Sequence, residues 1–234
     1  MKKSFNIIVS SSLIFCSFLS IHAQGKTVSE QELTALINNA NKKLSESNYR
    51  SISNSKSFKR SSDKTFNQFV TNVVEYISPD HRHTIYEFKS KEMNSRLETI
   101  SIGQKKYVKR NSEDWREIAA SENEFGFGGQ TGNIDGEVLI ERKYKGSEIL
   151  KNQNAELYEI ATTRKYNLPN FKYVYTVTER LWFAKNGTFL KKESETREDN
   201  GKITYYDILE YEYNPKNLKI EAPIIKTQSK RNPE

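Results

Sequence analysis

The stretch FKYVYTVTERLWF, residues 171–183, decides the fold class of this chain. Its side chains alternate between apolar and mostly polar types, which is the period of a half-buried antiparallel strand. One face is interrupted only by Glu179, and its apolar members are Phe171, Tyr173, Tyr175, Val177, Leu181 and Phe183. Asn186-Gly187 follows, and this dipeptide supplies the positive φ angles of a tight hairpin turn. The stretch is therefore predicted to be the first arm of a hairpin.

The same signals continue towards the C-terminus. Thr188–Arg197 is predicted to be the return strand, and Asn200-Gly201 turns the chain again. The next strand is interrupted only by Asp207, and its apolar face carries Ile203, Tyr205, Leu209, Tyr211 and Tyr213. Asn214-Pro215 marks a third turn, into a short strand at Leu218–Ile220. Strands joined by short turns predict an antiparallel meander.

The strand-like period begins at Tyr49 and extends, less regularly, through the first half of the chain. Strands are predicted at Phe66–Ile77, Thr84–Phe88, Arg96–Ile102 and Lys105–Lys109. Between the two halves, Glu122 to Gly136 contains Phe-Gly-Phe-Gly-Gly and is predicted to be a long loop. Because it lacks the Gly-Lys-Ser/Thr of a phosphate-binding loop, it is expected to be a flexible connection or a cover over a pocket.

One amphipathic helix is predicted before these strands. Ser29 and Glu32 have capping-box spacing, so each side chain can satisfy a free backbone N–H at the helix start. Five apolar residues recur at helical spacing and form one stripe: Leu33, Leu36, Ile37, Ala40 and Leu44. The helix is expected to end near Ser47, and its stripe must cover another element.

The first 23 residues have the features of a cleavable secretory signal peptide. Two lysines precede an apolar core, and the small Ala23 stands just before the predicted cut at Gln24. Phe15 is too bulky for a lipoprotein signal, so Cys16 is expected to leave with the signal. The mature chain, residues 24–234, is expected to be a single domain without cysteine, located in the periplasm or secreted.

The formal net charge of the whole chain is +7. This modest positive balance is compatible with anionic headgroups and with peripheral contact with a membrane. Export argues against nucleic acid as a partner.

Candidate catalytic and metal-ligating residues are few. His81 and His83 share one strand face, but no spacing places a third ligand near them, so no metal and no cofactor are predicted. No Gly-x-Ser-x-Gly elbow accompanies them, which argues against a hydrolase. Glu193 and Glu195 stand beside lysines on an ordinary strand and are not expected to form an acid–base pair. The sequence therefore predicts no catalytic residue.

Aromatic residues are the informative feature of the composition, with 13 Tyr, 12 Phe and 2 Trp. They fit either the core of a β-sandwich or one large curved sheet whose apolar face exceeds what a single helix covers. The second account predicts a surface that binds hydrophobic cargo. Its ligand-binding residues would be Phe171, Tyr173, Tyr175, Leu181, Phe183, Tyr205, Leu209 and Tyr211.

Several features in order resemble the LolA-like superfamily of periplasmic lipoprotein carriers. They are an exported helix, Ser78-Pro79-Asp80-His81-Arg82 before a strand, Glu98-x-Ile100-x-Ile102-Gly103 leading to Tyr107 and Trp115, and the ending Tyr211-x-Tyr213-Asn214 with Leu218-x-Ile220-x-x-Pro223. The resemblance implies an open half-barrel of antiparallel strands with helices closing an apolar cavity. It also implies shuttling or sensing of lipids or lipoproteins.

The sequence thus predicts a mainly β protein (α+β), an antiparallel meander forming an open half-barrel with an N-terminal amphipathic helix. Its expected function is non-catalytic binding of acyl chains, lipids or lipoproteins in the cell envelope. An envelope protein-interaction or sensor module is the first alternative, and an exported hydrolase is the second.

Overall fold

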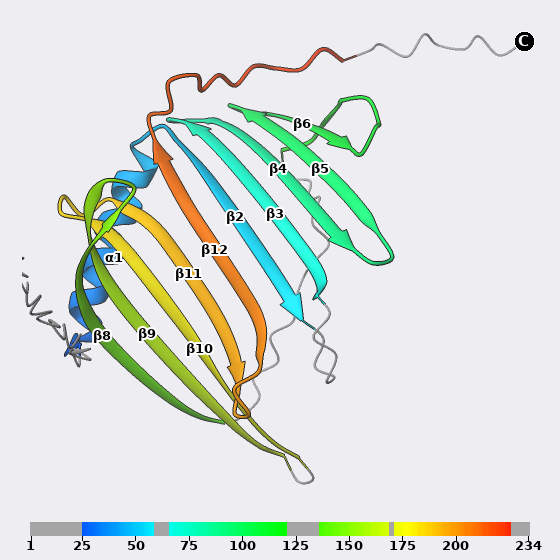
Figure 1. Cartoon of the computed structure of the whole chain (residues 1–234). Helices are drawn as coiled ribbons and strands as arrows, with labels where there is room; N and C mark the ends of the chain where they lie inside the picture. Colours follow the sequence, from blue (N-terminus) through cyan, green and yellow to red (C-terminus); the bar gives the residue numbers. More distant parts are fainter. Residues whose placement is uncertain (1–24, 59–65, 121–135, 169–170, 226–234) are drawn as a thin grey trace, which may run out of the picture.

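The computed structural model describes residues 25–58, 66–120, 136–168 and 171–225, which form one large sheet with one helix against it (Figure 1). The predicted signal peptide and residues 122–135 of the predicted loop lie outside the described residues. The elements are β1 (Lys26–Thr27), α1 (Glu30–Ser45), β2 (Tyr49–Phe58), β3 (Phe66–Ile77), β4 (His81–Ser90), β5 (Asn94–Ile102), β6 (Lys105–Arg110), β7 (Arg116–Ile118), β8 (Glu137–Leu150), β9 (Gln153–Leu168), β10 (Phe171–Ala184), β11 (Phe189–Glu198) and β12 (Ile203–Tyr213).

The sheet has twelve strands in the order β1-β8-β9-β10-β11-β12-β2-β3-β4-β5-β6-β7, and every pairing is antiparallel. Two meanders, β2 to β7 and β8 to β12, are joined where β12 pairs with β2. The two outermost strands, β1 and β7, do not pair with each other, so the barrel stays open. The predicted fold class, an open antiparallel half-barrel with an N-terminal helix, is confirmed. Since the described strands form a single sheet, the sandwich alternative is wrong.

The observed strands differ from the predictions in two parts of the chain. Leu218–Ile220 forms no strand; it is irregular chain whose buried Ile220 packs against Ile100 and Tyr107. The long strands β8 and β9 were not predicted, although they extend the sheet beyond the clearest strand. The C-terminal meander therefore has five strands, β8 to β12, rather than the four that were predicted.

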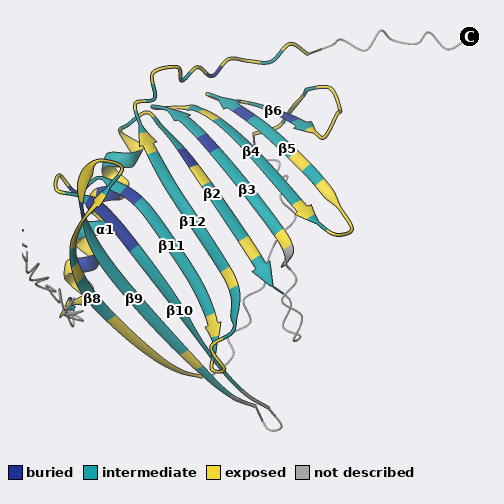
Figure 2. Ribbon diagram, viewed as in Figure 1, coloured by how far each residue is buried: buried dark blue, intermediate teal, exposed yellow. Residues whose placement is uncertain are grey.

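The two faces of the sheet are distinguished by α1. Buried Leu33 and Ala40 of the helix pack with Leu181 and Phe183 of β10, which fixes one face as the helix face. Side chains alternate across a strand, and residues paired across neighbouring strands share a face. The cross-strand pairs therefore assign every other residue to the helix face or to the opposite face. Figure 2 shows buried residues on β10 beside α1 and further buried positions on β2, β3 and β6.

The helix is fastened to the sheet at both ends. The Ser29 side chain accepts a hydrogen bond from the backbone N–H of Glu32, 3.1 Å away, as predicted. Glu30 in the first turn forms an ion pair of 3.0 Å with Arg142 of β8. At the other end, the Lys43 ammonium donates to the carbonyl of Asn186 in the β10–β11 turn. No helix among the described residues is long and apolar enough to cross a membrane.

Candidate ligand-binding site

An apolar pocket of about 180 Å³ lies between α1 and the helix face of β9, β10 and β11. Its apolar lining consists of Ile37, Ala40, Ile160, Leu181, Phe183 and Phe189. These side chains reach one space because α1 lies over three strands whose alternation points Ile160, Leu181 and Phe189 towards it. The pocket therefore combines the helical stripe with the apolar face of the strand predicted most clearly from sequence.

One ion pair closes the polar side of this pocket. Glu179 of β10, which interrupts the apolar alternation in the sequence, pairs with Lys192 of β11, and both side chains line the pocket with Asn41 of α1. Each charge is neutralised by its partner, which limits the energetic penalty of placing it beside apolar groups. The pocket thus has an apolar floor and a narrow charged border.

A row of aromatic rings continues from this pocket across the helix face. It contains one ring from each of seven neighbouring strands, β8 to β12 and then β2 and β3. Successive ring centroids are 5.1 to 5.8 Å apart, within the 4.5–7 Å typical of favourable aromatic pairs. The row consists of Tyr144, Tyr158, Phe183, Phe189, Tyr211, Tyr49 and Tyr76. We call this set the aromatic row.

Burial raises the pKa of three hydroxyls in the aromatic row, those of Tyr49, Tyr158 and Tyr211. Desolvation raises the pKa of Tyr211 to about 12, and the neighbouring Tyr49 adds to the shift. Burial also raises the pKa of Tyr213, whose ring stacks on Tyr211 and whose hydroxyl donates to the carbonyl of Phe189 at 2.8 Å. The pKa of Tyr49 is raised mainly by burial as well. The row is an uncharged surface across the physiological pH range.

The structure places the predicted ligand-binding residues on one face but not in one pocket. Leu181 and Phe183 line the pocket, and Tyr211 belongs to the aromatic row. Tyr173 and Tyr175 form a separate group with Tyr166 of β9, where the Tyr175–Tyr166 centroids are 6.0 Å apart. Tyr205 and Leu209 share the helix face farther along β12, and the Phe171 side chain lies outside the described residues. Their role in binding stays a prediction.

Sequence reasoning missed several residues of the pocket and the aromatic row. Ile160 and Tyr158 lie on β9, a strand that was not predicted. Phe189 was expected on a strand but not on the apolar face, and a β-bulge at Trp182/Phe183 sets its register. The helical stripe with Ile37 and Ala40 was the available signal, since it had to cover some apolar surface.

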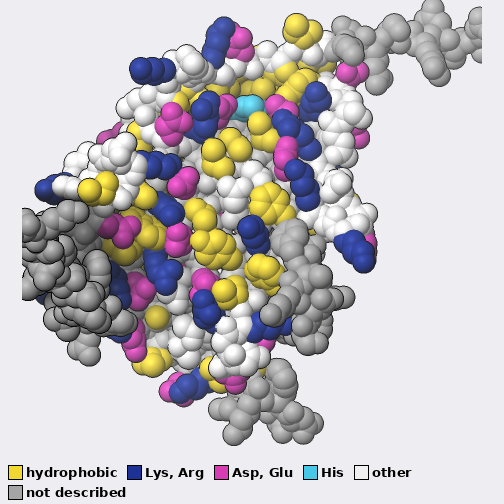
Figure 3. All heavy atoms as spheres, in the orientation of Figure 1, with side chains coloured by type: hydrophobic (Ala, Val, Ile, Leu, Met, Phe, Trp, Pro, Cys, Tyr) yellow, Lys and Arg dark blue, Asp and Glu magenta, His cyan; other side chains and the backbone are white. Residues whose placement is uncertain are grey.

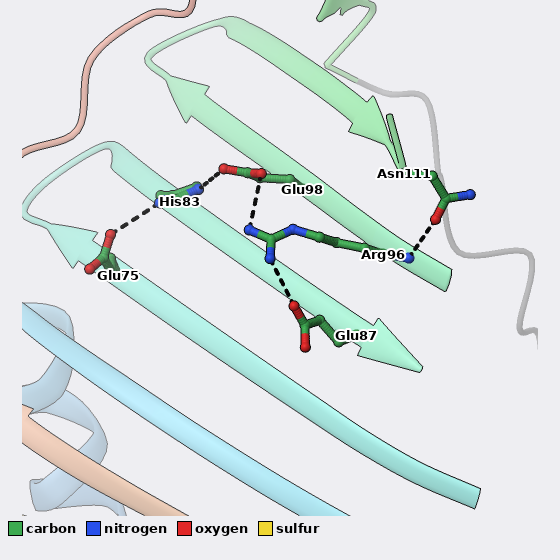
Figure 4. Close-up of polar contacts among 6 residues, drawn as sticks. All are labelled: Glu75, His83, Glu87, Arg96, Glu98 and Asn111. Atoms are coloured by element: carbon green, nitrogen blue, oxygen red, sulfur yellow. Dashed lines mark hydrogen bonds and ion pairs between the residues drawn. The ribbon is translucent and has the colours of Figure 1, made fainter. Parts of the chain in front are cut away.

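His83 lies on the opposite face and belongs to an ion-pair network (Figure 4). The Nδ1 of His83 is 3.0 Å from Glu75, and its Nε2 is 2.9 Å from Glu98. Arg96 joins Glu98 to Glu87, with distances of 3.4 and 2.8 Å. Both ring nitrogens of His83 therefore face a carboxylate.

The network leaves His83 without a nitrogen for a metal ion. Within the described ranges, no group of three or more His, Cys, Asp or Glu side chains is arranged to hold a metal. His81 contacts Asp80 at 2.9 Å. The two carboxylates considered from sequence are also paired, Glu193 with Lys191 and Arg180, and Glu195 with Arg197. Ion pairs account for these side chains, most of them within one strand, and Arg180–Glu193 joins β10 to β11.

Comparison with known proteins gives distant structural matches. The chain is similar in structure to LprF from Mycobacterium bovis, with a TM-score of 0.43, 10% identity, and 83% of this chain and 98% of that chain covered. It is also similar to a DUF1329 family protein from Desulfovibrio piger ATCC 29098, with a TM-score of 0.27, 12% identity, and 82% and 94% covered. No family model and no curated protein matches the sequence. The function is therefore inferred from the chain's own residues.

Proposed function

We propose that this protein binds the acyl chain of a lipid or lipidated protein between α1 and the helix face, without catalysis. The observation that carries the proposal is the apolar pocket lined by Leu181 and Phe183, which adjoins the aromatic row at Phe183 and Phe189. Each methylene transferred from water to such a surface contributes about 0.8 kcal/mol. Affinity would therefore grow with chain length rather than depend on a specific head group alone.

The size of the pocket limits how much of a chain it holds. At about 180 Å³ it is smaller than the roughly 300–1,000 Å³ of ordinary small-molecule sites. The proposal is that the terminal part of an acyl chain enters between Ile37 and Ile160, while the rest lies along the aromatic row. Longer chains then gain affinity until the row is covered.

The proposed location is the cell envelope or the exterior. It rests on the signal-like residues 1–23, which predict a mature N-terminus at Gln24. The intact mass of protein recovered from its own envelope tests this directly. A mass that retains an acylated Cys16 would show a lipid-anchored protein instead.

A pocket-filling substitution tests the binding proposal. Ile160→Trp places a larger side chain in the pocket and should weaken binding of a fluorescent fatty acid at least about tenfold, since it excludes several methylenes. Ala161→Trp makes a comparable change on the opposite face, because the next residue of a strand points the other way. It should leave affinity unchanged. Equal affinities of wild type and Ile160→Trp, with both proteins folded, would refute the site.

A second candidate function, docking of an envelope protein, is favoured by the edge of the sheet. Val138, Leu139 and Ile140 of β8 are 51%, 51% and 42% exposed. Among the described residues, β1 pairs with Lys143 and Tyr144 of that strand's outer edge, and the backbone N–H of Val28 donates to the carbonyl of Arg142, so Val138 to Ile140 have no strand partner on that side. Unpaired strand edges with apolar side chains accept an added strand. A stoichiometric partner that is lost in Leu139→Lys, with fatty-acid binding intact, would establish this second function.

A further inference from the structure

A small set of polar side chains lies together on the helix face, beside the aromatic row. Asp207 of β12 accepts hydrogen bonds from the hydroxyls of Ser53 and Ser55 of β2, at 2.8 and 2.6 Å. Both hydroxyls donate to the same carboxylate oxygen, Oδ1. The second oxygen, Oδ2, therefore keeps its acceptor positions, and the two serines hold the carboxylate in a fixed orientation.

Asp207 differs from Glu179, the other carboxylate in its cross-strand row. Glu179 is neutralised by Lys192, whereas no cation in the described part of the chain forms an ion pair with Asp207. A half-buried carboxylate is unfavourable unless a positive charge or hydrogen-bond donors compensate it. The serine hydroxyls compensate only part of this, which points to a donor supplied from outside the chain.

A second acceptor lies on the neighbouring strand. Asn72 of β3 is the cross-strand partner of Ser53, so Asn72 and Asp207 flank the serines on the same face. The amide oxygen of Asn72 is buried and has no hydrogen-bond partner. Buried acceptors almost always have a donor. Asn72 and Asp207 thus offer two independent acceptors on either side of one serine strand.

The register relates this polar group to the pocket. Glu179 pairs with Ser194, Ser194 with Asp207, and Asp207 with Ser55, so all four lie in one cross-strand row. Neighbouring strands are about 4.8 Å apart, which places Asp207 about 10 Å from Glu179 at the border of the pocket. An acyl chain with its end in the pocket has the length to bring its head to Asp207.

We infer that Asp207, Asn72, Ser53 and Ser55 form a subsite for a protonated amino group, so that the preferred acyl ligand carries a primary ammonium head. This inference rests on the proposed function, because the chain must lie on the helix face. An ammonium group offers three N–H donors and one positive charge, which match two acceptors and one unpaired carboxylate. A carboxylate or phosphate head offers neither and is repelled by Asp207.

The experiment compares three ligands that share a dodecyl chain and differ in their head group. Dodecylamine, dodecyltrimethylammonium and dodecanoate are used to displace a fluorescent fatty acid from the mature protein at neutral pH. Dodecylamine should displace the probe at a concentration about tenfold lower than dodecanoate. Dodecyltrimethylammonium keeps the charge but has no N–H donor. The concentration at which it displaces the probe should therefore lie between those of dodecylamine and dodecanoate. Dodecanoate that binds as tightly as dodecylamine would overturn the inference while leaving the proposed function intact. No binding of any of the three would refute both.

Variants of the protein test which residues cause the preference for dodecylamine over dodecanoate. Asp207→Asn should make dodecylamine and dodecanoate nearly equal, and Asn72→Leu should reduce the preference without removing it. Glu193→Gln changes a carboxylate on the opposite face, one cross-strand row away, and should leave the preference unchanged. A preference that persists in folded Asp207→Asn would overturn the subsite. If Asp207→Asn does not fold, the comparison of dodecylamine with dodecyltrimethylammonium on the wild type still decides it.

Discussion

The two faces of this sheet are built from the same strands but are stabilised differently. Among ion pairs between described strand residues, only Glu179–Lys192 lies on the helix face. The opposite face carries the continuous network from Arg50 through Glu75, His83 and Glu98 to Arg96. Both described histidines point to the opposite face, so Figure 3, in which a histidine is visible, views that face. It shows charged side chains of both signs scattered among hydrophobic ones.

The comparison shows which face is complete without a partner. The charged side chains of the opposite face neutralise one another in ion pairs and remain accessible to water. This face therefore needs no covering element. On the helix face, α1 packs over β9 to β11, and its last residue, Ser45, accepts a hydrogen bond from Ser78 beyond β3. Apolar side chains on this face that the helix leaves exposed, such as Tyr205 of β12, are the feature expected of a binding face. The following predictions separate the two faces, from the largest expected effect to the smallest.

The largest effect is expected from the side chain that joins α1 to the sheet. Phe183 is only 1% exposed and contacts the helix cluster. Phe183→Ala should lower the free energy of unfolding by about 3–5 kcal/mol, because it removes buried area and leaves a cavity. The melting temperature should fall by roughly 10 °C. Ile52→Ala on the opposite face, where Ile52 is 39% exposed, should cost less than about 1 kcal/mol. Equal losses would show that the faces are equally packed.

The second-largest loss of stability is expected at the contact between α1 and the β10–β11 turn. Gly187 has φ +80°, and a Cβ added there would lie 2.8 Å from the Nδ2 of Asn39 in the helix. Gly187→Ala should destabilise by about 2–3 kcal/mol, from backbone strain and this overlap. Gly201→Ala is the matched control, since Gly201 has the same φ of +80° but open space around it. It should lose only about 1 kcal/mol.

A double variant isolates the helix contact in chemical denaturation. Asn39→Ala combined with Gly187→Ala removes the overlapping amide and should bring the loss close to that of Gly201→Ala. If the double variant is no more stable than Gly187→Ala alone, α1 does not approach the turn as described.

The helix face should lose stability at alkaline pH. Because burial raises the pKa of Tyr211 from the ordinary 10 to about 12 in the folded protein, folding favours its neutral form. That contribution is complete below pH 10 and is lost as pH rises from 10 to 12. Tyr211→Phe should reduce this alkaline loss by about 1–2 kcal/mol. Denaturation midpoints across pH 8–12 measure it, and parallel curves for the two proteins would contradict the buried position of Tyr211.

The opposite face should lose stability at acid pH, by a smaller amount. Burial opposes ionisation of Glu75, but its hydrogen bonds to His83 and Arg50 outweigh burial and hold its pKa below the ordinary 4.5. The contribution is therefore present above pH 4.5 and lost as pH falls through the lowered pKa. Glu75→Gln should flatten the acid limb while leaving fatty-acid binding unchanged. Altered binding would connect the faces in a way not expected from the structure.

Local sequence patterns predicted those parts of the fold in which apolar residues recur with a single, regular period. The alternation of β10, the two Asn-Gly turns and the capping box before Glu30 all specify structure within a few residues. In β9 the pattern is lost because both faces carry apolar side chains, with Tyr158 under α1 and Leu157 beside Trp182. In β8 a β-bulge between Tyr144 and Gly146 shifts the alternation midway.

The site was less predictable than the fold for a physical reason. The apolar face of β10 was evident, but the pocket exists only where α1 meets Ile160 and Phe189, two contacts set by long-range register. Similarly, the alternation at Leu218–Ile220 reflects burial of Ile220 against Tyr107 rather than strand pairing. The subsite at Asp207 appeared in the sequence only as an exception to an apolar pattern.

The most direct test of the central claim is methyl NMR of the mature protein titrated with a fatty acid. Binding on the helix face should shift the methyl signals of Ile37, Ile160 and Leu181, which line the pocket. The signals of Ile52, Ile85 and Ile208, on the opposite face, should stay in place. Shifts confined to the first set would confirm an acyl-chain site under α1. Shifts confined to the second set, or no shifts at saturating ligand, would contradict it.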